Sequence, residues 1–168
     1  MNAPERFFLP DIQASADHRQ QAINKVGVKG LHYPLALFDG LGQVQHTVAE
    51  VSMAVGLSPE VKGTHMSRFI ELLEKKRPAL TPERLLRMLD EMLHRLDATS
   101  GTIELAFPYF ISKEAPISGV ESLLDYDVRL RVDKREGQDA ELHLEVVVPV
   151  TSLCPCSKKI SERGAHNQ

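Results

Sequence analysis

The sequence predicts an α+β fold in which an antiparallel sheet is covered on one face by a pair of helices. Segments with alternating apolar and polar residues, which are typical of half-buried strands, occur on both sides of residues 60–100. Within residues 60–100, apolar residues instead recur every three or four positions, which is typical of helices with one buried stripe. The order of strands, two helices and strands indicates an α+β domain rather than a series of βαβ units.

The first two strands are expected at residues 31–38 and 44–57, joined as a hairpin. Asp39, Gly40 and Gly42 lie between them and are typical turn residues. In the second strand one face is apolar and the other face is polar or small, which predicts that one face is buried. The apolar face consists of Val51, Met53, Val55 and Leu57.

Two helices are expected next. The first covers residues 67–77 and ends before Pro78, because a proline disfavours helical backbone in the residue before it. The second begins after Thr81, whose hydroxyl can cap the first turn, and Pro82 suits the first helical position. Ser100-Gly101 is expected to end it. Its predicted buried stripe consists of Leu85, Leu86, Leu89, Met92, Leu93 and Leu96.

Three further strands are expected after the helices, and residues 134–138 form the hairpin loop between the last two. Their apolar faces are Ile103, Leu105, Phe107 and Tyr109; Leu124, Tyr126, Val128, Leu130 and Val132; and Leu142, Leu144, Val146, Val148 and Val150. We divide the chain into an N-terminal arm (residues 1–25), a first module (26–150) and a segment with reactive side chains (151–168). Because reactive residues follow the last strand, we expect this segment to lead into a second module that these 168 residues do not contain.

The composition excludes several functional classes. A chain of 168 residues with 42% hydrophobic and 26% charged residues is an ordinary globular domain. Its 23 acidic and 20 basic residues give a net charge of -3, which argues against sequence-independent nucleic-acid binding. No apolar run approaches about 18 residues, the length of a membrane span. Residues 1–17 lack the layout of a signal peptide. We therefore expect a cytoplasmic protein that binds neither nucleic acid nor membranes.

The most informative segment is residues 151–159, in which Cys154 and Cys156 follow a strand. Two lysines come shortly after the cysteines, and their charge would lower the pKa of a thiol and favour the thiolate. His166 lies twelve residues after Cys154, which is far enough for the chain to turn back towards it. One thiolate and one imidazole suit a zinc-like divalent ion, and a third ligand, most simply a carboxylate, has to come from elsewhere.

Other interpretations of these residues stay open. A free cysteine is usually a small buried hydrophobic residue, although the polar, proline-containing sequence Cys-Pro-Cys-Ser-Lys argues against burial here. Histidines in surface loops are common, so His166 alone indicates little. Cys154 and Cys156 are also candidates for a dithiol redox switch, which mass measurement with and without reductant would reveal.

A second candidate segment, residues 62–69, lies between a predicted strand and a predicted helix. Gly63 permits a close approach of the backbone, and Thr64 or Ser67 can cap the helix. Lys62 and Arg68 add positive charge to exposed N–H groups at a helix N-terminus, which is an arrangement that binds phosphate. The alternative is an ordinary capped connection with a solvated Arg68.

Four segments together resemble one enzyme family, the type IB GTP cyclohydrolases. They are Gly-Thr-His-Met-Ser-Arg-Phe (63–69), Ser-Leu-Leu-Asp-Tyr-Asp (122–127), Pro-Val-Thr-Ser-Leu-Cys-Pro-Cys-Ser (149–157) and Gly-Ala-His-Asn-Gln (164–168). The resemblance implies the tunnelling fold, with two modules in one chain, and a homotetramer with active sites at subunit interfaces. The implied reaction converts GTP and water to 7,8-dihydroneopterin triphosphate and formate, which is the first step of tetrahydrofolate biosynthesis.

The resemblance also implies roles for individual residues. Cys154 matches the metal-binding cysteine of the family and His166 its metal-site histidine, and both are the candidate catalytic residues. The candidate substrate-binding residues in the matching segment are His65, Ser67 and Arg68. The implied cofactor is a divalent metal ion, namely zinc, manganese or iron. Family chains continue past the position of Gln168 with glutamates that complete the site, so we expect these 168 residues alone to fold partly and to lack activity.

Two alternatives belong to other functional classes. A nitrile reductase of the same fold reduces a deazaguanine base with NADPH, using a cysteine nucleophile and no metal. The Gly-Ala-His-Asn-Gln sequence after Cys-Pro-Cys argues against this enzyme, and metal content would separate the two. A non-catalytic module that acts only in binding or assembly is the other alternative, and GTP binding would test it.

Overall fold

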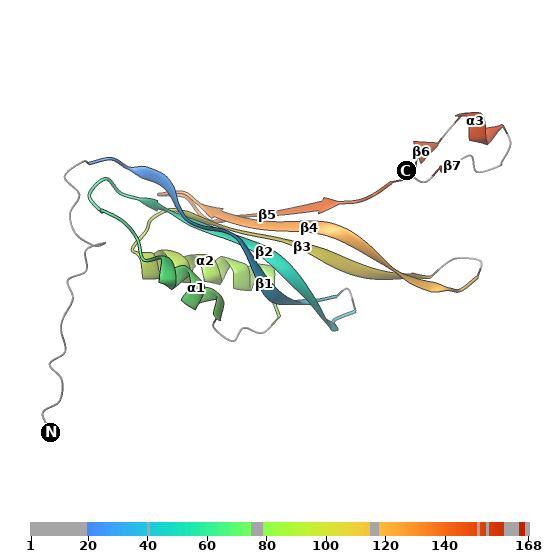
Figure 1. Ribbon diagram of the computed structural model, residues 1–168, viewed down its shortest axis with the longest axis horizontal. Helices are drawn as coiled ribbons and strands as arrows, with labels where there is room; N and C mark the ends of the chain where they lie inside the picture. Colours follow the sequence, from blue (N-terminus) through green and yellow to red (C-terminus); the bar gives the residue numbers. More distant parts are fainter. Residues whose placement is uncertain are drawn as a thin grey trace, which may run out of the picture.

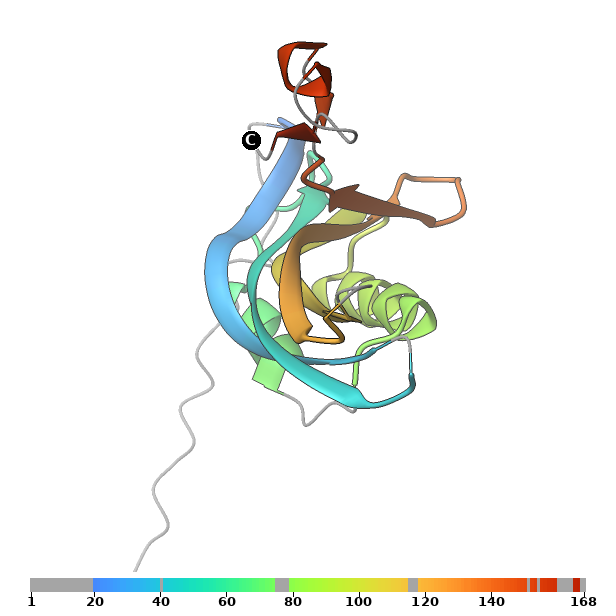
Figure 2. The same cartoon turned by 90° about the vertical axis from the view of Figure 1, so that its right-hand side faces the viewer.

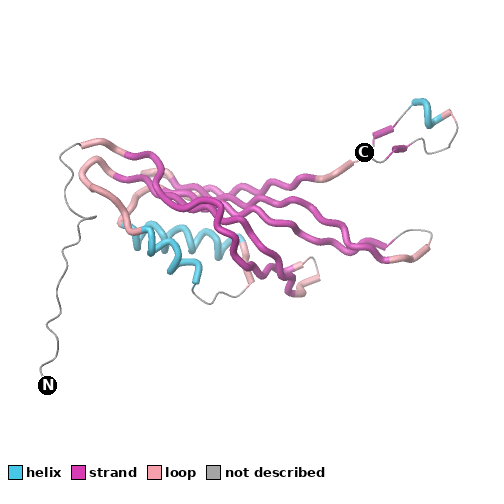
Figure 3. Tube along the Cα trace, in the orientation of Figure 1, coloured by secondary structure: helices cyan, strands magenta, loops and turns pink. Residues whose placement is uncertain are grey.

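The computed structural model describes residues 20–39, 41–74, 79–114, 118–150, 152–153, 155–159 and 165–166. It confirms an α+β fold, because a five-stranded sheet carries two helices on one face (Figure 1; Figure 3). The strands of this sheet are β1 (Ile23–Phe38), β2 (Val44–Leu57), β3 (Gly101–Glu114), β4 (Glu121–Lys134) and β5 (Glu141–Val147). The helices are α1 (Met66–Glu74) and α2 (Pro82–Leu96), which lie between β2 and β3 in the chain.

The sheet follows the chain order β1-β2-β3-β4-β5, and every neighbouring pair is antiparallel. Helix α1 packs against β1, whereas α2 packs against β3 and β4. The opposite face of the sheet, which we call the open face, carries no helix (Figure 2). Among the described residues, no helix is both long and apolar enough to cross a membrane.

The core lies between the sheet and the helices, where the predicted alternation places it. In β2 the side chains of Val51, Met53 and Val55 are at most 1% exposed. The helices contribute a fully buried stripe that includes Phe69 and Leu89. Burial of one such large apolar side chain stabilises the fold by roughly 1.5–3 kcal/mol. The predicted stripe of α2 is confirmed except for one residue. Leu86, which the sequence predicts to be buried, is half-buried, and Met88 is buried instead.

Helix α2 begins as the sequence predicts but ends earlier. The hydroxyl oxygen of Thr81 accepts a hydrogen bond from the Arg84 amide at 3.3 Å, and Pro82 occupies the first turn. The helix ends at Leu96 because Asp97 adopts a left-handed conformation, with φ 50°, that closes the last turn. Gly101, expected to help end the helix, instead starts β3. A Cβ there would lie 2.9 Å from a Leu93 methyl group, so glycine permits the close helix–sheet contact.

Strand β1 starts at Ile23, well before the predicted start at residue 31, so it includes the last residues of the predicted arm. Its register with β2 shifts between Val28 and Leu31, where Gly30 has a φ of +73°. This irregularity interrupts the period of two, which is why the pattern predicts only the second half of the strand. Residues 1–19 of the arm lie outside the described residues, as do residues 75–77 of the first predicted helix.

The β2–β3 ladder stops at the pair Glu50–Ala106, two residues before Pro108. Beyond this point side chains replace the backbone ladder. The amide of Gln45 donates to the Phe110 carbonyl and accepts from the Phe110 N–H, both at 2.9 Å. The Thr47 hydroxyl donates to the Pro108 carbonyl at 2.9 Å. As a result the β1–β2 and β3–β4 hairpins diverge at their far ends (Figure 1).

Strand β5 forms one edge of the sheet and is exposed along its whole length. Leu142, Leu144 and Val146 pair with core-facing residues of β4 and therefore point to the helix side, yet they remain 36–65% exposed. The predicted alternation extends to Val150, but the strand ends at Val147, two residues before Pro149, which cannot donate a ladder hydrogen bond.

Candidate functional site

The C-terminal segment folds as a small unit of its own. It contains β6 (Ser152–Leu153), the short helix α3 (Pro155–Lys158) and β7 (Ala165–His166). β6 and β7 pair antiparallel, with Ser152 opposite His166 and Leu153 opposite Ala165. The chain therefore turns back as expected, and it brings the backbone of His166 next to the residues that immediately precede Cys154 in the sequence.

The two predicted metal ligands are only partly placed by this pairing. Cys154 lies outside the described residues, and His166 is described by its backbone alone, so their meeting at one metal ion stays a prediction. Cys156 is an exposed free cysteine in α3. Among the described side chains, no three His, Cys, Asp or Glu groups gather closely enough to hold a metal ion.

The second candidate segment joins β2 to α1. Thr64 is buried, with 7% of its surface exposed, and His65 immediately precedes the helix. The Arg68 amide donates to the His65 carbonyl at 3.2 Å, which closes the first turn of α1. Ser67 is exposed in this turn, and Lys62 is exposed before it. The segment from Lys62 to Ser67 thus presents one ammonium group and one hydroxyl to solvent.

Arg68 has a partner that the sequence does not reveal. Its Nη1 atom donates a hydrogen bond to the carbonyl oxygen of Arg95, in the last turn of α2, at 2.7 Å. The side chain is half-buried. Arg68 is therefore not the solvated side chain of the alternative interpretation, and part of its hydrogen-bonding capacity is used within the protein.

The two candidate segments leave opposite ends of the sheet. β2 ends beside the start of β3, the end of β4 and the start of β5, since Val55 pairs with Gly101, Gly101 with Lys134 and Asp133 with Glu141. The C-terminal unit follows the other end of β5, and Figure 1 shows it far from α1. Within the part of the chain that the structure describes, His65 and Ser67 therefore do not lie close to the β6–β7 pair.

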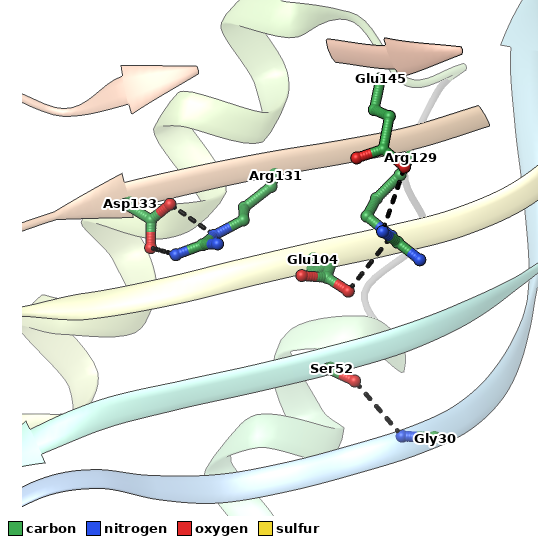
Figure 4. A network of polar contacts seen from close by, with 7 residues as sticks. All are labelled: Gly30, Ser52, Glu104, Arg129, Arg131, Asp133 and Glu145. Carbon is green, nitrogen blue, oxygen red and sulfur yellow. Dashed lines mark hydrogen bonds and ion pairs between the residues drawn. The ribbon is translucent and has the colours of Figure 1, made fainter. Parts of the chain in front are cut away.

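A network of charged side chains occupies the open face (Figure 4). Arg129 bridges Glu104 at 3.5 Å and Glu145 at 3.2 Å, so it links three strands. Arg131 binds Asp133 through two nitrogen atoms, at 2.6 and 2.9 Å. These groups line a shallow polar cavity of about 650 Å³. The sequence signal was the alternation of charged residues with core residues along β4, which predicts their face but not their partners.

The surroundings of Asp133, a carboxylate of this network, shift its pKa. Partial burial opposes ionisation, but hydrogen bonds from Arg131 and Thr102 and the charges of Arg131 and Lys25 outweigh it, so its pKa lies below the ordinary value. The Thr102 hydroxyl donates to the carboxylate at 2.7 Å. A carboxylate with a lowered pKa stabilises the folded state above the pKa of the unfolded chain, about 3.9, and this contribution is lost as the pH falls through the folded value.

We therefore expect Asp133→Asn to lower the urea midpoint of unfolding at pH 7, and this difference from the unsubstituted protein should shrink as the pH is lowered from 5 to 3. Asp139→Asn removes the same charge from an exposed loop residue and serves as the control. If the difference in urea midpoint between Asp133→Asn and the unsubstituted protein stays constant down to pH 3, the Asp133 carboxylate is not the cause of the destabilisation.

A separate apolar cavity of about 630 Å³ lies between α2 and the far ends of β1 and β2. Its walls include Tyr33, Leu35, Val51 and Met88, and Arg84 and Arg87 also contribute to its lining. None of the predicted site residues contributes to it. The cavity is therefore a feature of the helix–sheet packing that the sequence motifs do not predict.

Comparisons with known proteins agree with the motifs. A family model described as type I GTP cyclohydrolase FolE2 matches residues 9–168. A GTP cyclohydrolase FolE2 1 of Dechloromonas aromatica is 67% identical over 168 residues, which is 100% of this chain and 63% of that protein. Proteins named GTP cyclohydrolase FolE2 from Azoarcus sp. and Burkholderia multivorans are each 54% identical over 100% and 96% of this chain, and 62% and 60% of their own length. The chain thus spans about three-fifths of these relatives. It belongs to the type I GTP cyclohydrolase FolE2 family.

Proposed function

We propose that the protein carrying this chain is a GTP cyclohydrolase, which converts GTP and water to 7,8-dihydroneopterin triphosphate and formate at the start of tetrahydrofolate biosynthesis. The observation that carries this proposal is the family match over residues 9–168, which includes both candidate segments. Neither the nitrile reductase nor the non-catalytic module gains comparable support, because the relatives compared above are all named as GTP cyclohydrolases.

We propose that Cys154 and His166 hold a divalent metal ion, namely zinc, manganese or iron. A thiolate and an imidazole are suitable donors for such an ion. The antiparallel pairing of Ser152 with His166 supports their proximity. When bound, the ion supplies Lewis acidity that activates water for attack on the purine at neutral pH. A carboxylate from elsewhere in the protein completes the ligand set.

Within this mechanism the chain's own residues bind and orient the substrate. Two roles remain open for His166: it only holds the metal ion, or it also assists the proton transfers as the purine ring opens. At the other candidate segment, we assign His65 and Ser67 to substrate binding, with the triphosphate near the first turn of α1. The exposed Ser67 hydroxyl and the exposed Lys62 support an anion there.

We further propose a tunnelling fold with a second module and a homotetramer whose active sites lie between subunits. The opposite placement of the two candidate segments supports this assembly, because only a second copy or module can bring a triphosphate-binding segment to the metal ligands of the first. The exposed edge strand β5 is consistent with a further partner. We also infer a cytoplasmic location, where a reducing environment preserves free thiols.

The test is to express the protein from its complete gene and to incubate it with GTP and manganese or zinc. Formate release and the fluorescence of the oxidised pterin are followed together, with a chelator-treated sample as the control. The proposal requires both products in a ratio of one to one and their loss on chelation. Oxidation of NADPH in the presence of a nitrile-bearing deazaguanine, without formate from GTP, would instead support the nitrile reductase.

A further inference from the structure

We propose that Arg68 is a positioning residue that fixes the segment preceding α1, rather than a direct donor to the substrate. The observation is the hydrogen bond from its Nη1 atom to the Arg95 carbonyl at 2.7 Å. Arg95 is the second-last residue of α2, and the last four carbonyls of a helix have no partner within the helix. Arg68 therefore supplies a donor that α2 lacks.

The electrostatics of this contact favour the bond. The C-terminal end of a helix carries partial negative charge, and a guanidinium there is stabilised. The bond is charge-assisted, which makes it stronger than a hydrogen bond between neutral groups. Partial burial of Arg68 reduces competition from water. The bond uses one of the five guanidinium N–H donors and ties the end of the Arg68 side chain to α2.

A second contact joins the same two helices. The Arg95 side chain pairs with Glu91 of its own helix at 3.0 Å and reaches Glu71 of α1 at 3.8 Å. The two arginines thus connect α1 and α2 in different ways. Arg68 binds a backbone carbonyl, whereas Arg95 uses its side chain to form ion pairs. This difference provides a matched control for the role of Arg68.

The segment that Arg68 holds is short and needs such support. Helix α1 has nine residues, and a helix of this length is marginal without tertiary contacts. On one side of His65, Thr64 is buried. On the other side, the Arg68 amide closes the first turn on the His65 carbonyl, and the Arg68 guanidinium binds α2. His65 is therefore held between two fixed points.

This inference rests on the proposed function, which places His65 and Ser67 at the triphosphate of GTP. If Arg68 positions these residues, its loss loosens the segment even when no nucleotide is bound. If Arg68 instead only binds a phosphate, its loss weakens binding of the triphosphate substrate but leaves the nucleotide-free segment in place. Hydrogen exchange of residues 62–68 in the nucleotide-free protein therefore separates the two roles.

The experiment compares Arg68→Ala, Arg68→Lys and the control Arg95→Ala in the complete protein. Hydrogen exchange of the amides of residues 62–68 is measured together with kcat and KM for GTP and GDP. We expect Arg68→Ala to speed exchange in this segment by about 10- to 100-fold, the range for losing a hydrogen bond to a charged group. In the same variant kcat/KM for GTP should fall, because His65 and Ser67 lose their fixed positions.

The other two variants sharpen the test. Arg68→Lys keeps a cationic donor for a single carbonyl and should restore part of the exchange protection and of kcat. Arg95→Ala leaves its carbonyl in place, so exchange in residues 62–68 should remain near that of the unsubstituted protein. Unchanged exchange in nucleotide-free Arg68→Ala, with weakened binding of GTP, overturns the proposal in favour of a direct phosphate contact. If the unsubstituted protein releases no formate from GTP, the proposed function fails, whereas the exchange data still decide whether Arg68 holds the segment.

Discussion

Replacing Cys154 with alanine is expected to remove most of the bound metal and essentially all turnover, whereas Cys156→Ala should keep both. Replacing even a residue that only supports a metal ligand lowers metal affinity by about 10- to 100-fold. Loss of the thiolate itself should lower the affinity by at least the upper end of that range. The two cysteines are separated by a single proline, and Cys156 is an exposed free thiol in α3. Cys156 is therefore a matched control for chemistry and for location.

Elemental analysis of both purified variants, together with formate release from GTP, decides this assignment. Metal retained by Cys154→Ala and lost by Cys156→Ala would exchange the roles of the two residues. Equal loss in both variants would point to a dithiol site, and equal retention would exclude the segment from metal binding. A comparison of mass with and without reductant, performed on the same samples, reports whether the pair forms a disulfide.

The largest expected effect on stability comes from Phe69, which is 0% exposed at the centre of the helix–sheet core. Phe69→Ala removes most of a large aromatic side chain and leaves a cavity that close-packed neighbours refill only in part. Such substitutions destabilise a domain by about 3–5 kcal/mol, which is a large share of the roughly 5–15 kcal/mol that separates folded from unfolded domains. The variant is expected to unfold at a much lower urea concentration.

Ile70→Ala is the control, since Ile70 is the next residue of α1 and is 38% exposed. It should change the free energy of unfolding by no more than about 1 kcal/mol, because part of its surface already contacts water. Circular dichroism during urea unfolding measures both variants. If the two midpoints coincide, Phe69 does not occupy the core position described here.

Regular hydrophobic periodicity accounts for the parts of the fold that the sequence predicts well. Strand β2 is predicted to its observed bounds, because the helix side of the strand is apolar from Ala49 to Leu57 and the turn residues before it are unambiguous. The start of α2 is predicted because Thr81 and Pro82 act through local backbone chemistry. Signals of this kind depend only on neighbouring residues, so they can be read without knowledge of the tertiary structure.

The differences arise where long-range contacts decide the outcome. The first half of β1 is held by pairing with β2 across a shifted register, and no local pattern reveals this pairing. The end of α2 depends on the left-handed conformation of Asp97, a residue type that adopts it less readily than glycine.

In the candidate site, too, local motifs predict the residues but not their long-range contacts. Motifs in the sequence name Cys154, His166 and the segment around His65, because the chemistry of these residue types and their spacing is distinctive. The partner of Arg68 could not be predicted, since the Arg95 carbonyl lies 27 residues away in sequence and belongs to the backbone of another helix. The placement of the two candidate segments at opposite ends of the sheet likewise follows only from the strand register.

The sheet is held together in two different ways along its length, because the side-chain bonds of Gln45 and Thr47 take over where the β2–β3 backbone ladder stops. In the half that the helices cover, bending requires breaking a continuous backbone ladder and a packed core. Beyond Ala106 the two hairpins are linked by three hydrogen bonds from two side chains, two of them exposed to water and each worth only about 0.5–1.5 kcal/mol. The outer parts of the two hairpins are therefore linked more weakly than the part of the sheet that the helices cover. A change in their separation costs only these side-chain hydrogen bonds and leaves the packed core untouched.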